Sequence, residues 1–211
     1  MDITVFLGAP GSGKGTQAKR LAQAHGFRHF STGDMLRAAM AEGAEIGKKA
    51  KSFIDRGELV PDALMIELIE GALEPLDDNT RVVLDGFPRT VPQAEALDEK
   101  TLTTVRRALY FKVPTHTLIE RLTGRRICEK CGEPFNIAFV PPKVRGICDR
   151  CGGKLIQRSD DAEAVVRRRL EVFASQNDQL LSYYKNVGKL TELDAGVPVA
   201  VLQDKLIQLL R

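Results

Sequence analysis

Several features that would place this chain outside the ordinary globular class are missing from its 211 residues. No apolar run approaches the roughly 20 residues of a membrane-spanning helix. Met1-Asp2 leads directly into an apolar stretch, without the charged and apolar regions of a secretory signal. Net charge is only +3, too small to indicate nucleic-acid binding, and no internal repeat is present. We therefore expect a cytoplasmic protein with no membrane or nucleic-acid partner, long enough to bury a hydrophobic core.

Cysteine is absent except at residues 128, 131, 148 and 151. The four form two Cys-x-x-Cys pairs with sixteen residues between them, and a glycine follows each pair. Disulfides are the less common use of cysteine in a cytoplasmic protein, whereas four thiolates at this spacing are typical of a closed tetrahedral zinc site. We predict a structural Zn²⁺ bound by Cys128, Cys131, Cys148 and Cys151, which folds a small module without a core of its own. A redox pair and two disulfides are the alternatives.

A glycine-rich stretch, GAPGSGKGT at residues 8–16, lies between an apolar run at 3–7 and a helical pattern that starts near residue 17. The order strand, glycine loop, helix predicts a concave group of backbone N–H donors that binds phosphate. Lys14 can reach the outer phosphates and Thr16 has a hydroxyl for Mg²⁺. The general pattern has Ser or Thr directly after the lysine, so the intervening Gly15 makes a direct Thr16–Mg²⁺ bond less secure.

A second group of candidates combines an acid with arginines. Asp85 ends the apolar run at 81–85, where a parallel strand presents ligand-binding groups, and its carboxylate can hold Mg²⁺. Arg89 follows in the tight loop of residues 86–88, and guanidinium groups bind phosphate oxygens in a bidentate manner. The other candidates are Arg37, Arg121, Arg125, Arg158 and Arg169. Arg158 and Arg169 could share one face of a helix that covers both, although Arg167 or Arg168 could equally be the inward residue.

The remaining pattern indicates the fold class. We expect strands at 3–7, 81–85, 108–113 and 189–193, and helices at 62–73, 93–97, 115–123, 160–184 and 199–210. Residues 31–60 are predicted to be a helical insertion that begins at a Ser31-Thr32 cap, and residues 124–161 lose periodicity. Alternating strands and helices predict an α/β protein with a doubly wound parallel sheet.

Four motifs resemble those of the adenylate kinases: residues 8–16, the run STGDMLR at 31–37, the run DGFPR at 85–89, and GRR at 124–126. The cysteine insert is similar to the zinc-bearing long lid of the bacterial form. This resemblance implies a P-loop kinase core (1–30, 61–123 and 162–211), an AMP-binding segment (31–60) and a lid (124–161). It implies a monomer that transfers the γ-phosphoryl group of ATP to AMP, giving two ADP, with Mg²⁺ as the ATP-bound cofactor and with lid closure.

The resemblance also assigns residues. It places the ATP phosphates and base on Gly11, Ser12, Gly13, Lys14, Gly15, Thr16, Arg125, Pro134, Phe135 and Val197. It places AMP on Thr32, Arg37, Glu58, Leu59, Val60, Gly86, Phe87, Pro88, Arg89, Gln93, Arg158 and Arg169. The implied catalytic group is Lys14, Asp85, Arg89, Arg121, Arg125, Arg158 and Arg169. The Gln93 amide suits adenine because it can donate and accept at once. The three histidines, at 25, 29 and 116, are interpreted as bystanders.

Two other classes of function stay open at this point. One is a nucleic-acid-binding zinc-ribbon protein with an ATPase core, favoured by basic residues between 125 and 154 but opposed by interspersed acids and by the lack of interleaved aromatics. The other is a nucleotide-binding regulator without turnover. The sequence also leaves open whether ATP or GTP is the donor.

Overall fold

The computed structural model describes residues 1–99 and 104–211. The strands are β1 (Asp2–Leu7), β2 (Arg28–Ser31), β3 (Arg81–Asp85), β4 (Thr104–Lys112), β5 (Arg125–Cys128), β6 (Pro134–Asn136), β7 (Leu155–Ile156) and β8 (Leu190–Asp194). The helices are α1 (Lys14–His25), α2 (Thr32–Ala41), α3 (Glu45–Arg56), α4 (Asp62–Leu73), α5 (Val91–Asp98), α6 (Thr115–Thr123), the 3₁₀ turn η1 (Ser159–Asp161), α7 (Glu163–Asn186) and α8 (Val199–Leu209). Within the described ranges, none of these helices has the length and apolar character needed to cross a bilayer.

Five strands form one parallel sheet in the order β2-β3-β1-β4-β8. Strand β1 lies at its centre, with Ile3 opposite Val82 of β3 and Val105 of β4. The predicted α/β class with a doubly wound parallel sheet is confirmed. Phe6 of β1 lies opposite Asp85 of β3. The glycine loop after β1 and the acid that ends β3 therefore lie side by side at the carboxyl ends of these two parallel strands.

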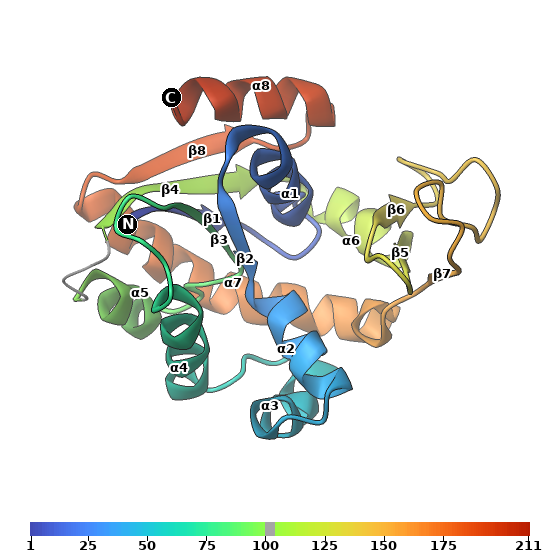
Figure 1. Cartoon of the computed structure of the whole chain (residues 1–211), viewed down its shortest axis with the longest axis horizontal. Helices are drawn as coiled ribbons and strands as arrows, with labels where there is room; N and C mark the ends of the chain where they lie inside the picture. Colours follow the sequence, from blue (N-terminus) through green and yellow to red (C-terminus); the bar gives the residue numbers. More distant parts are fainter. Residues whose placement is uncertain (100–103) are drawn as a thin grey trace.

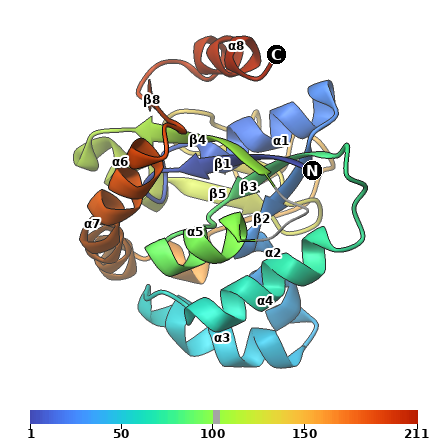
Figure 2. The ribbon, with the colours of Figure 1, turned by 90° about the vertical axis from the view of Figure 1, so that its left-hand side faces the viewer.

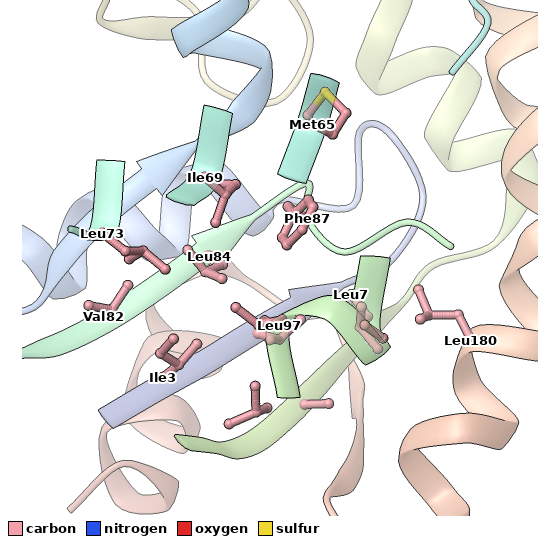
Figure 3. Packing of buried hydrophobic residues seen from close by; sticks show 14 of the residues in the cluster. Ile3, Leu7, Met65, Ile69, Leu73, Val82, Leu84, Phe87, Leu97 and Leu180 are labelled. Carbon is pink, nitrogen blue, oxygen red and sulfur yellow. The ribbon is translucent and has the colours of Figure 1, made fainter. Parts of the chain in front are cut away.

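Both faces of the sheet are buried, as a parallel sheet with helices on either side requires. Alternate residues of β1 point in opposite directions, so Ile3 and Leu7 join one cluster while Phe6 joins the other. Helices α1 and α8 cover the second cluster, and α4, α5 and α7 lie on the opposite face (Figures 1 and 2). Figure 3 shows the first cluster at close range, where Leu84 and Phe87 pack beneath side chains of α4.

Helices α2 and α3 pack against each other at the bottom of the view in Figure 1. Ser31 caps α2, because its hydroxyl accepts a hydrogen bond from the N–H of Asp34 at 3.4 Å, which confirms the predicted cap. Gly47 sets the spacing of the pair. A Cβ at Gly47 would lie 2.4 Å from the carbonyl carbon of Ala39, so only glycine allows the two backbones to come this close.

The stretch that contains the four cysteines, residues 124–161, is called here the cysteine segment. It follows α6 and projects from the sheet at the right of Figure 1. Its strands form a three-stranded antiparallel sheet in the order β6-β5-β7, and its buried cluster consists of Cys128, Phe135, Cys148 and Leu155. With two cysteines among four buried residues, this cluster is too small to hold the segment by apolar burial alone.

The structure corrects the sequence-based expectations in the parallel sheet and in the long helix, and the cysteine segment contains short strands that the sequence did not predict. Residues 28–31 were left out of the sheet, but they pair with residues 82–85 as its edge strand. The long helix was expected from residue 160 and begins at Glu163, so Arg158 precedes both η1 and α7. The argument that Arg158 and Arg169 share one helical face is therefore wrong, although both side chains line the same cleft.

Candidate active site

A cleft of about 1230 Å³ lies where β1 and β3 end. Its wall combines the glycine loop, the start of α2, the loop after β3, the cysteine segment and the turn before α8. Every site residue predicted from the sequence lines this cleft except Phe87 and the four cysteines. Phe87 is only 2% exposed and packs in the main core, as Figure 3 shows, so any contact it makes with a ligand involves its backbone.

The side chain of Lys14 folds back over the glycine loop and is hydrogen-bonded to it. The Lys14 ammonium donates hydrogen bonds to the carbonyl oxygens of Gly8 at 2.7 Å and Ala9 at 2.9 Å, and to the hydroxyl of Ser12 at 3.2 Å. Removal of this ammonium from water lowers its pKa to about 8, while the neighbouring charge of Asp85 opposes the change. The loop thus presents a cation that is costly to keep charged unless an anion joins it.

Asp85 lies directly beside this loop. A Cβ on Gly15 would be 3.0 Å from Asp85 Oδ2, so the absence of a side chain at position 15 lets the carboxylate approach. Burial disfavours the charged form of Asp85, but the imidazole of His29 and the ammonium of Lys14 hold its pKa below the ordinary value. His29 Nε2 lies 3.8 Å from Asp85 Oδ2, so His29 is a neighbour of the site rather than a distant bystander.

The arginines of the cleft are held by acids that sequence reasoning missed. Arg125 of β5 forms a two-pronged contact with Asp161, at 2.7 and 2.5 Å. Arg169 of α7 contacts Asp160 Oδ2 at 2.9 Å and Asp161 Oδ1 at 3.4 Å. Asp160 and Asp161 are buried, so each counters the charge of neighbouring guanidinium groups in a region of low polarity.

A third acid joins α2 to the end of the cysteine segment. Asp34 accepts hydrogen bonds from Arg37 at 2.6 Å and from Arg158 at 3.0 Å, although the two arginines are far apart in sequence. Burial, followed by the charge of neighbouring arginines, lowers the pKa of both Arg89 and Arg158 to about 10. Both therefore stay charged at neutral pH. Their crowding creates a strongly positive site that an anion with several charges would stabilise.

Arg121 is positioned differently from the other arginines. Its guanidinium donates to the carbonyl oxygen of Ala195 at 3.2 and 3.3 Å, and it lies 5.9 Å from the ring centre of Phe139 in the cysteine segment. None of the contacts described for Arg121 is an ion pair, so its charge is available to the cleft.

Another part of the cleft wall is built on the loop after β3. The Thr32 hydroxyl donates to the carbonyl oxygen of Gly86 at 2.9 Å, and Arg89 Nε donates to the same oxygen at 2.8 Å. These bonds hold the start of α2 against the loop. Gln93, at the first turn of α5, is 1% exposed and contributes to the wall nearby.

This geometry joins a phosphate loop, an adjacent acid and a group of arginines in one cleft. The family model described as adenylate kinase matches residues 6–189. The chain belongs to the adenylate kinase family. A protein of Thermodesulfovibrio yellowstonii named adenylate kinase is 51% identical over 190 residues, which cover 88% of each chain. One of Carboxydothermus hydrogenoformans is 47% identical over 193 residues, 90% of each chain, and one of Fervidobacterium nodosum is 44% identical over 209 residues, 98% of this chain and 96% of its own.

In this member of the adenylate kinase family the four cysteines converge on one point. Their Sγ atoms all lie within 4.8 Å of one another, and none forms a disulfide. A Cβ on Gly153 would lie 2.8 Å from the Sγ of Cys128, so the backbone wraps closely around the sulfur atoms. Four soft donors that face one centre fit a tetrahedral zinc ion and leave no vacant ligand position.

Proposed function

We propose that the protein catalyses reversible transfer of the γ-phosphoryl group of ATP to AMP, giving two ADP. The observation that carries the proposal is the convergence of Lys14, Arg89, Arg125, Arg158 and Arg169 on one cleft beside a phosphate loop. Membership of the adenylate kinase family supports the same reaction. Transfer between two nucleotides demands a site of this kind, because phosphate oxygens of both substrates bring negative charge together.

The assignment of residues is part of the proposal. ATP is bound by residues 11–16 together with Arg125, Pro134, Phe135 and Val197. AMP is bound by Thr32, Arg37, Glu58, Leu59, Val60, Gly86, Phe87, Pro88, Arg89 and Gln93, with Arg158 and Arg169 close to the transferred group. Arg121 and Lys14 complete the catalytic set, and Asp85 would hold the metal that accompanies ATP.

No side chain needs to form a covalent intermediate, because an oxygen of the AMP phosphate attacks the γ-phosphorus in line. The protein contributes position and charge: backbone N–H groups of the loop hold the β-phosphate region, and arginines stabilise the negative charge of the transition state. Magnesium, when bound with ATP, neutralises phosphate charge, and Asp85 is the carboxylate beside the loop that can hold it. The arginines must exchange Asp34, Asp160 and Asp161 for phosphate oxygens, at least in part, when nucleotides bind.

The organisation of the chain follows from the same proposal. Residues 31–60 form the AMP-binding segment, the cysteine segment acts as a lid that shields the reaction from water, and the remainder is the core. Zinc on the four cysteines stiffens the lid without contacting the substrates. We further propose a monomeric cytoplasmic enzyme without a nucleic-acid partner.

An assay of ADP formation tests the proposal. With ATP, AMP and Mg²⁺ the purified protein should form two ADP for each ATP consumed, and omission of AMP should stop consumption. Lys14→Met should reduce turnover by about a hundredfold or more, whereas Lys112→Met, which removes an exposed lysine at the end of β4, should leave it unchanged. ATP consumption that does not depend on AMP would contradict the proposal and favour an ATPase. No consumption of ATP, with or without AMP, would also contradict it and favour a regulator without turnover.

A further inference from the structure

The side-chain amide of Gln93 is held at both of its ends. Its Oε1 accepts a hydrogen bond from the backbone N–H of Arg89 at 2.8 Å, and its Nε2 donates one to Asp62 Oδ1 at 2.6 Å. A backbone N–H can only donate and an ionised carboxylate can only accept, so these partners allow one orientation of the amide. Rotation of the amide by 180° would set two donors against each other at Arg89 and two acceptors at Asp62.

Asp62 is itself fixed in place. It is the first residue of α4, and its Oδ1 also accepts a hydrogen bond from the Thr90 hydroxyl at 3.1 Å. Thr90 in turn caps α5, because its Oγ1 accepts from the N–H of Gln93 at 3.3 Å. The starts of α4 and α5 are thereby joined around a single buried amide.

An amide has two N–H donors and two acceptor positions on its oxygen. After the bonds to Asp62 and Arg89, Gln93 keeps one N–H and one acceptor position, and its side chain lines the cleft. A 6-aminopurine offers a complementary pair, an amino N–H beside the ring acceptor N1. A 6-oxopurine offers the reverse pair, a carbonyl oxygen beside an N1–H donor, which would fit only the rotated amide.

We propose that Asp62 is a positioning residue that makes Gln93 select a 6-aminopurine over a 6-oxopurine in the acceptor nucleotide. The inference rests on the proposed function only in taking the Gln93 side of the cleft as the acceptor site. Asp62 does not need to touch the nucleotide. It fixes the order in which Gln93 presents its donor and its acceptor, and so gives the rotated amide, which the oxo base requires, an unfavourable energy.

A purely structural role for Asp62 predicts a different result. A carboxylate at the first turn of a helix stabilises that helix through its dipole, and loss of this effect would lower stability without changing base preference. Binding measurements separate the two roles, because selectivity between two ligands of similar size and equal phosphate charge does not depend on global stability.

The experiment measures dissociation constants of AMP and inosine monophosphate by calorimetry on the intact protein, without ATP, so that the result does not require turnover. Asp62→Ala should change AMP binding by no more than about twofold, because the Arg89 N–H still favours the same amide orientation. It should tighten inosine monophosphate binding about tenfold, because the rotated amide no longer sets two acceptors against each other. Asp62→Asn keeps the size and shape of the side chain, but its amide can rotate and either accept from or donate to Gln93, so this variant should also lose most of the selectivity. The KM for ATP should not change in either variant.

Glu163→Ala is the matched control, because it removes an exposed carboxylate from the first turn of α7, outside the cleft. It should leave both dissociation constants unchanged. An equal loss of affinity for both nucleotides in Asp62→Ala, or an unchanged preference, would overturn the inference. So would a selectivity in Asp62→Asn as high as that of the parent protein. If the dissociation constants change as expected but the parent protein forms no ADP, the proposed function is rejected and the inference about Asp62 stands.

Discussion

The affinity for ATP should fall steeply as pH rises above 8, because Lys14 loses its proton there in the free protein. Its pKa is lowered from 10.5 to about 8 by removal from water. The folded protein therefore binds this proton less tightly than the unfolded chain does. Below pH 8 the charged Lys14 lowers the free energy of unfolding by about 3 kcal/mol. Between pH 8 and 10.5 the unfolded chain binds more protons than the folded protein, so this loss of stability is recovered as the pH rises.

Bound phosphate stabilises the charged ammonium, so the pKa of Lys14 is higher in the ATP complex than in the free protein. Binding above pH 8 must then take up a proton. If the lysine stays charged throughout the bound state, the dissociation constant for ATP should increase about eightfold between pH 7.5 and pH 9. Proton uptake should rise from about 0.2 to about 0.9 per ATP over the same interval.

Titration calorimetry with ATP alone, in buffers of different ionisation enthalpy, measures both quantities. Lys14→Met is the matched variant, since it keeps the side chain's length and apolar stem without the titrating group. Its binding should be weaker at pH 7.5 and nearly independent of pH up to 9. The reasoning fails if the parent protein takes up less than about 0.3 proton at pH 9, or if Lys14→Met shows the same dependence.

Three further predictions concern stability. Replacing Cys128 and Cys148 by serine should abolish zinc binding and lower the melting temperature by roughly 5–10 °C, with most activity retained at 25 °C; inactivity at every temperature would indicate a catalytic metal. Tyr184→Phe should leave the free energy of unfolding unchanged or raise it by about 1 kcal/mol, because this buried hydroxyl has no hydrogen-bond partner among the described residues; a loss above about 1 kcal/mol in urea denaturation would contradict this. Asp161→Ala should cost about 3 kcal/mol in the same assay, since it leaves Arg125 without its buried partner, and an unchanged midpoint would refute the importance of that pair.

The sequence predicted those parts of the fold that local patterns specify. Apolar runs identified β1 and β3, and the glycine loop identified the phosphate site between β1 and α1. Strand β2 was missed because Arg28 and His29 interrupt its short apolar pattern, and an edge strand needs no long apolar run. The small strands of the cysteine segment were missed because turns around cysteines, rather than hydrophobic periodicity, determine their pairing.

The sequence predicted the cations of the site and the carboxylate of Asp85, but not the acids that pair with the arginines. Glycine-lysine and arginine motifs are contiguous and can be recognised locally, whereas Asp161 meets Arg125 across 36 residues and Asp62 meets Gln93 across 31. Such pairs become visible only when the topology places two loops together. The adjacent Asp160 and Asp161, next to a segment rich in arginine, are the signal that the sequence offers.

Contact between the backbones of α2 and α3 at Gly47 has a consequence for protein engineering. At Gly47 a residue of α3 lies directly against the main chain of Ala39 and Met40 in α2, so the two helices cannot slide or rotate at this point without a collision. Attempts to redesign α2 and α3 should therefore transfer both helices together with the turn that connects them. Exchanging either helix alone would place a new surface at Gly47, where no Cβ can be accommodated.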